Sequence, residues 1–380
     1  MATAIPFTPH ADEAVLSRIR RQFAEYRWPH VPPGLGWSCG AEADTVRHLA
    51  DRWLNHFDWR AEEARMNQRA HFKAEAAGTV LHGVHVRAAR ASDRAPLVLV
   101  HGWPGSFLEY LEVADRVAGA DDGGRDVVVV SLPGTGYSDT PEQPMGPRAV
   151  ARSVHALMTE VLGHARYVAH GADWGSIVSA WLGFDQPAHC AGVHMTMVSP
   201  RFVAGLVKEP EEQAWLAGFR ERFEDDGAYF RLQTTRPATA GFLLADNPVG
   251  LLAWMLEKFA AWSDPAQGDP SALFRTPELA DRLLRNVMLY LVTGTAASSI
   301  WIYRALTAEG PPGYPGGQRV NVPVAFAATR DPMFVPPPRG LVEKAYNVVR
   351  WTALPRGGHF PGLEVPELLA DDIAAFANGL

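Results

Sequence analysis

The stretch that decides the fold is Tyr167-Val168-Ala169-His170-Gly171-Ala172-Asp173-Trp174-Gly175-Ser176. A β-type run ends there in a small-x-Asp-x-small turn, and a helical pattern follows over residues 177–184. This layout is typical of a nucleophile elbow, the sharp strand-to-helix turn that pushes one side chain clear of a sheet. We expect Gly171 and Gly175 to be needed on its two sides, because the backbone is strained and a Cβ at either position would clash.

The residue at the centre of this turn is Asp173, where the most familiar elbow carries serine. A carboxylate does not carry out serine-type acyl transfer, but it can displace a leaving group from an sp³ carbon and form an alkyl-enzyme ester. The other interpretation is an aspartate that caps a helix. The flanking glycines, placed after an apolar strand and before a helix, favour the nucleophile.

Composition bounds the class of protein. The chain has 380 residues, of which 47% are hydrophobic and 20% are charged, which suits one large α/β domain with an insertion. The net charge of −7 argues against nucleic acid as a partner. The two cysteines, Cys39 and Cys190, exclude a disulfide framework and a cysteine-rich metal site, and we expect two thiols in a reducing compartment.

Targeting signals are not apparent in the sequence. Residues 1–6 contain neither the basic nor the apolar region of a signal peptide, so we expect none. No run of about 18 apolar residues is present, so we expect no membrane span and, by default, a cytoplasmic location. The oligomeric state is open, with a homodimer as one arrangement.

Continuous apolar runs alternate with helical segments through much of the chain. Such runs are typical of parallel strands that are buried on both faces, and helices of the right length lie between them, around residues 108–117 and 149–162. A doubly wound, mostly parallel sheet is therefore predicted. Its strands are expected at residues 96–100, 127–130, 168–169, 192–198, 322–327 and 348–353.

The pattern predicts four segments. Residues 1–75 form a largely helical N-terminal segment, and residues 76–200 form the first part of the α/β core. Residues 201–315 are helical and rich in aromatic side chains, which indicates a cap inserted over the sheet. A glycine- and proline-rich run ends this cap, and residues 316–380 complete the core with a terminal helix.

His359 is the candidate base. It lies in Arg356-Gly357-Gly358-His359-Phe360-Pro361, just after the last predicted strand, where the third member of a triad in the order nucleophile, acid, histidine belongs. It would take a proton from the water that attacks the Asp173 ester. The alternative is that it is one of fourteen histidines, packed in a loop.

An oxyanion hole is predicted at a second turn. The stretch His101-Gly102-Trp103-Pro104-Gly105-Ser106 follows the strand at residues 96–100. In folds with this elbow one backbone N–H comes from that loop and one from the residue after the nucleophile, here Trp103 and Trp174. A simple Pro-Gly turn is the alternative.

Taken together these motifs resemble the microsomal-type epoxide hydrolases, with their N-terminal segment, of the α/β-hydrolase superfamily. The resemblance covers nearly the whole chain, and the His-Gly-Trp-Pro-Gly-Ser turn with the Asp-Trp-Gly elbow is its most specific pair. Further matches are Phe57-Asp58-Trp59-Arg60 through Asn67, Asn247-Pro248-Val249-Gly250-Leu251, Asn286-Val287-Met288-Leu289-Tyr290 through Gly294-Thr295, and Arg356 to Phe360.

The resemblance implies an α/β-hydrolase fold with a helical cap and two cap tyrosines that hydrogen-bond the epoxide oxygen, Tyr229 and Tyr303. Such donors suit the chemistry, because an alkoxide is a poor leaving group unless it is protonated or hydrogen-bonded, and a phenol with a pKa near 10 keeps its proton at neutral pH. Similar bacterial enzymes include some in natural-product pathways, so a bacterial origin and such a role are further expectations.

One position departs from the family pattern. The resemblance would place a glutamate near Met333, and methionine cannot orient a histidine. In the wider superfamily an aspartate after this strand is the usual acid, and Asp331 precedes His359 by 28 positions, so we assign the acid to Asp331. The alternative is that Asp331 starts a turn before Pro332.

The sequence therefore predicts an epoxide hydrolase that converts an epoxide and water into a vicinal diol without a cofactor or metal. His56, His71, His82 and His85 lack the spacing of a metal site, and Gly134-Thr135-Gly136 is a poor dinucleotide signal. Two alternatives stay open. One is a haloalkane dehalogenase with the same Asp nucleophile, and the other is a ligand-binding protein that kept the fold without catalysis.

Overall fold

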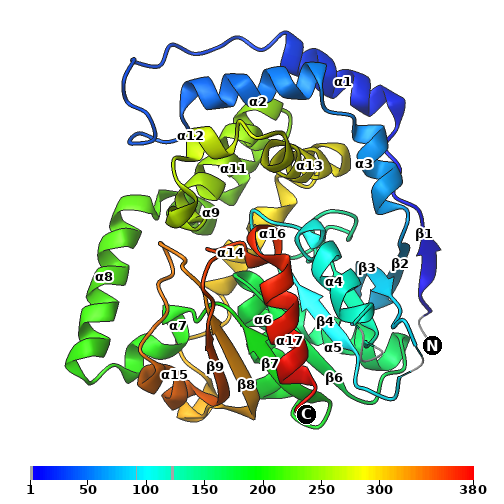
Figure 1. The fold of residues 1–380 in the computed structure, drawn as a ribbon, viewed down its shortest axis with the longest axis vertical. Coiled ribbons are helices and arrows are strands. Elements are labelled where there is room, and N and C mark those ends of the chain that lie inside the picture. The colour runs from blue at the N-terminus through cyan, green and yellow to red at the C-terminus, as the bar shows by residue number, and fades with distance from the viewer. Residues whose placement is uncertain (1–2, 91, 121–123) are drawn as a thin grey trace.

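A nine-stranded sheet runs through the computed structural model, which describes residues 3–90, 92–120 and 124–380 (Figure 1). The strand order is β1-β2-β3-β5-β4-β6-β7-β8-β9. The strands are β1 (Ile5–Phe7), β2 (Ala70–Ala76), β3 (Thr79–Val86), β4 (Leu97–Val100), β5 (Val127–Val130), β6 (Tyr167–Gly171), β7 (Cys190–Met195), β8 (Val320–Ala328) and β9 (Tyr346–Ala353).

The sheet is mostly parallel, which confirms the predicted fold class. Strands β5, β4, β6, β7, β8 and β9 pair in parallel, and β1, β2 and β3 add an antiparallel edge to β5. The four valines of β5 are all buried, because helices cover both faces of the sheet. Helices α4 (Leu111–Ala118) and α17 (Pro366–Ala377) lie on one face, and α5 (Pro147–Ala156) and α6 (Trp174–Asp185) lie on the other (Figure 1).

The N-terminal segment differs from the largely helical extension that the sequence predicts. Its strand β1 pairs with β2, with Phe7 opposite His71, so this segment completes the edge of the sheet. A strand of three residues carries no readable period, which is why the pattern missed it.

The helix expected over residues 149–162 also differs from the structure, because it becomes a π-helical turn, η2 (Leu157–Val161), after Ala156.

The helices of the N-terminal segment lie on the cap. Helices α1 (Glu13–Ala24) and α2 (Ala43–Asn55), the blue helices at the top of Figure 1, cross the cap helices α11 (Pro248–Trp262) and α13 (Pro277–Thr293). Arg52 forms two hydrogen bonds with Asp281 of α13, at 2.8 and 2.7 Å. Helix α3 (Trp59–Met66) follows, and the Asp58 side chain caps it by accepting the N–H of Arg60 and of Ala61. This segment therefore joins the sheet edge to the cap.

The cap occupies the interval between β7 and β8, and the regular elements among its described residues are all helices joined by turns and loops. No single helix among them is long and apolar enough to cross a membrane, and the one pair that reaches this length and composition, α10 with α11, is bent by 118°. The cap elements are α7 (Pro200–Val203), η3 (Ala204–Leu206), α8 (Pro210–Asp226), α9 (Ala228–Thr235), α10 (Pro237–Leu244), α11 (Pro248–Trp262), η4 (Pro265–Gln267), α12 (Pro270–Leu273), α13 (Pro277–Thr293), η5 (Ser298–Ile300), α14 (Trp301–Leu306) and η6 (Pro315–Gly317).

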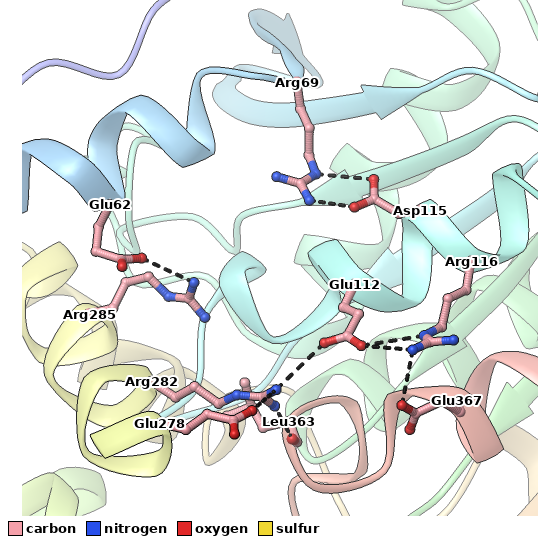
Figure 2. A network of polar contacts seen from close by, with 10 residues as sticks. All are labelled: Glu62, Arg69, Glu112, Asp115, Arg116, Glu278, Arg282, Arg285, Leu363 and Glu367. Carbon is pink, nitrogen blue, oxygen red and sulfur yellow. Dashed lines mark hydrogen bonds and ion pairs between the residues drawn. The ribbon is translucent and has the colours of Figure 1, made fainter.

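Ion pairs line a cleft of about 380 Å³ where α3, α4 and α13 meet (Figure 2). Arg69 pairs with Asp115, and Arg285 pairs with Glu62 at 3.2 Å. Arg282 and Arg116 extend the network to Glu278, Glu112, Glu367 and the Leu363 carbonyl. The arginines drawn in Figure 2 all pair with carboxylates, which neutralise their charges. The network also links the N-terminal segment to the core and to the cap.

Two buried histidines join β2 and β3 to the strand that follows them in the sheet. His71 Nε2–H donates to the Met66 carbonyl at 2.9 Å, so its Nδ1 accepts from His82 Nε2–H, also at 2.9 Å. His82 Nδ1 in turn accepts from the Ser131 hydroxyl at 2.8 Å. Burial lowers the pKa of His71, and it lowers the pKa of His82 well below its usual value, with the neighbouring His71 charge adding to the effect.

This histidine pair is expected to make the protein acid-sensitive. Each folded-state pKa lies below the unfolded value of 6.5, so the unfolded chain binds more protons and stability falls as the pH drops below 6.5. A protonated His71 would also bring two N–H groups face to face. Urea unfolding at pH 7.5 and 5.0 should show His82→Gln losing less stability than the wild type, by about 1 kcal/mol per pH unit. Equal losses in the two proteins would contradict this.

Candidate active site

The turn between β6 and α6 has the strained geometry that the glycines predict. Asp173 has φ 50° and ψ −124°, a backbone conformation that non-glycine residues rarely adopt. A Cβ on Gly171 would lie 2.1 Å from the Gly175 carbonyl carbon, and a Cβ on Gly175 would lie 1.7 Å from the Val100 oxygen. A third glycine, Gly102, leaves room for the Asp173 side chain itself, since a Cβ there would lie 2.2 Å from Asp173 Oδ1.

The Asp173 carboxylate faces two different groups. Its Oδ1 accepts the backbone N–H of Trp103 at 2.9 Å. Its Oδ2 lies 3.5 Å from His359 Nε2, and the side chain is 13% exposed. The elbow therefore presents one oxygen to an N–H donor and the other to an imidazole.

His359 lies between two carboxylates. Its Nδ1 is 2.6 Å from Asp331 Oδ2, while the other oxygen, Asp331 Oδ1, accepts the N–H groups of Met333 and Phe334 at 2.8 and 2.9 Å. Burial alone would lower the pKa of His359, but the charges of Asp331 and Asp173 and the hydrogen bonds to them raise it to about 10. The acid partner of the histidine is thus the aspartate that the sequence proposes, and Met333 contributes its backbone rather than its side chain.

The loop that carries His359 is anchored to the cap. The His359 N–H donates to the Trp262 carbonyl at 2.9 Å, and the Gly357 N–H donates to the Asp264 carboxylate at 2.9 Å. Gly358 has to be glycine, because a Cβ there would lie 2.4 Å from the Asp264 nitrogen. Glu364 accepts the N–H groups of Gly358 and Phe360 at 3.0 and 2.9 Å. Sequence reasoning missed Asp264 and Glu364, since nothing in their local patterns distinguishes them from other surface acids.

The two predicted tyrosines come from different cap helices and meet above the elbow. Tyr229 of α9 stacks on Trp103 with centroids 5.7 Å apart, and Tyr303 of α14 packs edge-on against Trp174 at 4.7 Å. The two phenol rings contact each other at 6.0 Å. Burial raises the pKa of Tyr229 well above its usual value, with the Asp173 charge next in effect, and burial also raises that of Tyr303. Both phenols therefore stay protonated near the Asp173 carboxylate.

The turn that carries Trp103 is held by α13. The Asn286 amide donates to the Pro104 carbonyl at 2.7 Å and accepts the Ser106 hydroxyl at 2.7 Å, while the Tyr290 hydroxyl donates to the Gly105 carbonyl at 2.6 Å. The Asn-to-Tyr motif of the sequence thus fixes the predicted oxyanion donor. The backbone N–H of Trp103 already donates a hydrogen bond to Asp173. In the described part of the chain, the backbone N–H of Trp174 makes no hydrogen bond to that carboxylate.

Glu109 is a site residue that sequence reasoning missed. It lies in η1 (Phe107–Tyr110), directly after the predicted oxyanion turn, and is 4% exposed. Burial raises its pKa to about 8, the His359 charge acts in the opposite direction, and the Asp173 charge adds to the rise. A carboxyl group that stays neutral therefore lies within electrostatic range of both proposed catalytic groups. The only sequence signal that could have identified Glu109 was an acidic residue so close to the predicted oxyanion turn.

Glu109 is expected to cost stability at alkaline pH. Its folded pKa of about 8 exceeds the usual 4.5, so the folded state holds more protons between these values and stability falls as the pH rises through that window. Glu109→Gln cannot ionise. In urea unfolding its stability should fall less between pH 5 and pH 8 than that of the wild type, by about 1 kcal/mol or more. Identical pH dependence in the two proteins would refute the assignment.

The described residues contain no group of three or more His, Cys, Asp or Glu side chains placed to hold a metal ion.

The fold and the elbow define the class of protein, and family models agree with them. Residues 95–364 match the model of the alpha/beta hydrolase fold, and residues 4–110 match the model described as "Epoxide hydrolase N terminus".

Known proteins resemble the chain over nearly its whole length. It is 34% identical to a putative epoxide hydrolase of Stigmatella aurantiaca over 97% of this chain and 83% of that protein. The structure of an enantioselective mutant of the Aspergillus niger epoxide hydrolase is 29% identical, with a TM-score of 0.85 over 100% of this chain and 97% of that one. Juvenile hormone epoxide hydrolase from the silkworm Bombyx mori is 26% identical, with a TM-score of 0.86 over 100% and 95%. The chain belongs to the epoxide hydrolase family, and it is an enzyme of that activity.

Proposed function

We propose that this epoxide hydrolase works in two steps through a covalent ester on Asp173. The observation that carries the proposal is the position of the His359 imidazole, with Nδ1 at 2.6 Å from Asp331 and Nε2 at 3.5 Å from Asp173. A histidine held in this way by a buried acid can take a proton from water beside the nucleophile.

In the first step Asp173 Oδ2 forms a bond to an epoxide carbon, and the bond between that carbon and the ring oxygen breaks. The electron pair stays on the ring oxygen, which takes a proton from one of the two phenols, Tyr229 or Tyr303. Asp173 Oδ1, which accepts the Trp103 N–H at 2.9 Å, becomes the carbonyl oxygen of the ester.

The second step depends on a change in charge. While Asp173 is ionised, His359 has a pKa of about 10 and is protonated at neutral pH, so it is not a base. Ester formation removes the Asp173 charge, which lowers the pKa of His359 and lets its proton pass to the phenolate. The neutral imidazole then takes a proton from water, and the resulting hydroxide attacks the carbonyl carbon of the ester while the N–H groups of Trp103 and Trp174 stabilise the oxyanion. The intermediate collapses when the bond between this carbon and the diol oxygen breaks. The departing alkoxide takes the proton of the hydroxyl that was added, directly or through His359, so Asp173 returns as a carboxylate beside protonated His359.

The two phenols favour the epoxide reaction over a haloalkane reaction. A halide leaving group needs weak N–H donors and no proton, whereas a ring-opened epoxide oxygen needs a proton donor, and Tyr229 and Tyr303 provide two beside Asp173. The aligned acid, histidine and nucleophile also argue against a purely ligand-binding role. Four further expectations stay predictions for this protein: a cytoplasmic location, assembly as a homodimer, a bacterial origin and a place in a natural-product pathway.

A single turnover in ¹⁸O-labelled water tests the covalent step. With enzyme in excess over an aryl epoxide such as styrene oxide, the new oxygen of the diol should come from Asp173 and carry no label. The solvent label should appear in the peptide that contains Asp173, as read by mass spectrometry. Label in the diol of the first turnover would mean that water attacks the epoxide directly, and the two-step proposal would be wrong.

A further inference from the structure

A lysine is buried in the cap next to one of the two phenols. Lys258 lies in α11 and is 2% exposed, although lysine is rarely buried unless its charge is paired. Its Nζ donates to Asp226 Oδ1 at 2.6 Å and to Glu257 Oε1 at 2.8 Å. The ammonium group is therefore fixed in position.

The same ammonium group lies over two aromatic rings. It is 4.8 Å from the centroid of Tyr229 and 5.5 Å from that of Trp262. A cation within about 6 Å of a ring face interacts favourably with the ring, and more strongly when both are desolvated. Tyr229 therefore lies between the Asp173 side of the site and a buried positive charge.

Asp226 connects this lysine to the histidine. Its second oxygen, Oδ2, accepts the Trp262 indole N–H at 2.6 Å. The Trp262 ring packs against His359 at 4.9 Å and against Tyr229 at 5.1 Å. Lys258, Asp226 and Trp262 therefore form one layer behind the groups that would act in the two chemical steps.

The charges in this layer act on the phenol. Burial raises the pKa of Tyr229 most, then the charge of Asp173, and the charges of Asp226 and Glu257 raise it further. These negative charges oppose the build-up of negative charge on the Tyr229 oxygen as it gives up its proton to the epoxide oxygen. A positive charge 4.8 Å from the ring opposes their effect, and in a desolvated site such a fixed charge acts strongly.

We propose that Lys258 is a positioning residue for ring opening: its fixed charge favours proton donation by Tyr229 to the epoxide oxygen, and it has little effect on ester hydrolysis. This inference rests on the proposed two-step function. It assigns a role in the reaction to a residue that does not itself contact the reacting atoms.

Rapid-quench measurements with styrene oxide separate the two steps. Lys258→Met removes the charge and keeps an apolar side chain of similar length, and Asp226 keeps its bond from Trp262. Formation of the Asp173 adduct should slow by about 10- to 100-fold, and hydrolysis of the adduct should change by less than about 3-fold. Lys344→Met is the matched control, because Lys344 also pairs with a buried cap acid, Glu212, at 2.6 and 2.8 Å. It should leave both rates close to wild type.

A double-mutant cycle tests whether Lys258 acts through Tyr229. If it does, adding Lys258→Met to Tyr229→Phe should slow adduct formation by no more than about 2-fold beyond Tyr229→Phe alone. If the two effects multiply, or if Lys258→Met slows both steps equally, the role of Lys258 is structural and the inference is wrong.

A second variant keeps the inference testable should Lys258→Met fail to fold. Glu257 is partly exposed, and Glu257→Gln removes one opposing charge while Lys258 keeps Asp226. Adduct formation should become about 2-fold faster, and slower formation would overturn the inference. Failure of the two-step function would look different, because the wild type would then form no Asp173 adduct.

Discussion

His359→Gln is expected to stop turnover after the first chemical step. The amide can still donate a hydrogen bond to Asp331, but it cannot take a proton from water, so the ester on Asp173 should form and persist. Hydrolysis should slow by roughly 10²- to 10⁴-fold, which is the usual contribution of a general base. Intact-protein mass spectrometry should show a species heavier than the enzyme by the mass of one epoxide.

The control for this variant is a histidine away from the site. His30 is exposed, and His30→Gln should turn over at the wild-type rate without accumulating an adduct. If His359→Gln binds styrene oxide but no adduct appears, His359 does not act in ester hydrolysis.

Asp173→Asn is expected to abolish turnover before any adduct forms. An amide oxygen is too weak a nucleophile to open the epoxide, while its carbonyl can still accept the Trp103 N–H that reaches Oδ1 at 2.9 Å. Loss of a catalytic nucleophile typically reduces kcat by roughly 10⁴-fold or more. Diol formation measured by chromatography should fall to background, and no adduct should be seen by mass spectrometry.

The same variant makes a prediction about the histidine. The Asp173 charge helps to raise the pKa of His359 to about 10, so Asp173→Asn should move this pKa downward, as an NMR titration of the ring can show. An unchanged titration would mean that the two side chains are not coupled. Residual turnover within about 100-fold of wild type would instead show that Asp173 is not the nucleophile.

The elbow could be predicted from sequence because its constraints are local. Gly171 and Gly175 are required by contacts within the turn and with the adjacent strand, and Asp173 has a positive φ because the strand-to-helix bend demands it. The buried strands could be predicted for a similar reason, since four consecutive valines at Val127–Val130 have few other uses. The edge strand β1 could not, because its pairing partner is 64 positions away at His71.

The family pattern alone did not identify the acid beside His359, and the structure was needed to place it. The resemblance placed a glutamate near Met333, and the nearest carboxylate in the sequence was only a candidate. The structure brings Asp331 to 2.6 Å from the imidazole and uses Met333 as an N–H donor to the same carboxylate. The departure at Met333 therefore leaves the histidine with an acid partner.

By itself, the sequence determined the parallel strands of the sheet, the elbow with Asp173 at its centre and the histidine loop, because each depends on the conformational limits and hydrophobic period of a short stretch of chain. Only the tertiary structure decided which residues surround them. Glu109, Asp264 and Lys258 come from separate elements, and their local sequences do not distinguish a buried charge from a solvated one. Whether such a group is charged, paired or neutral depends on how well it is shielded from water, and that follows from the way the cap and the sheet close around it.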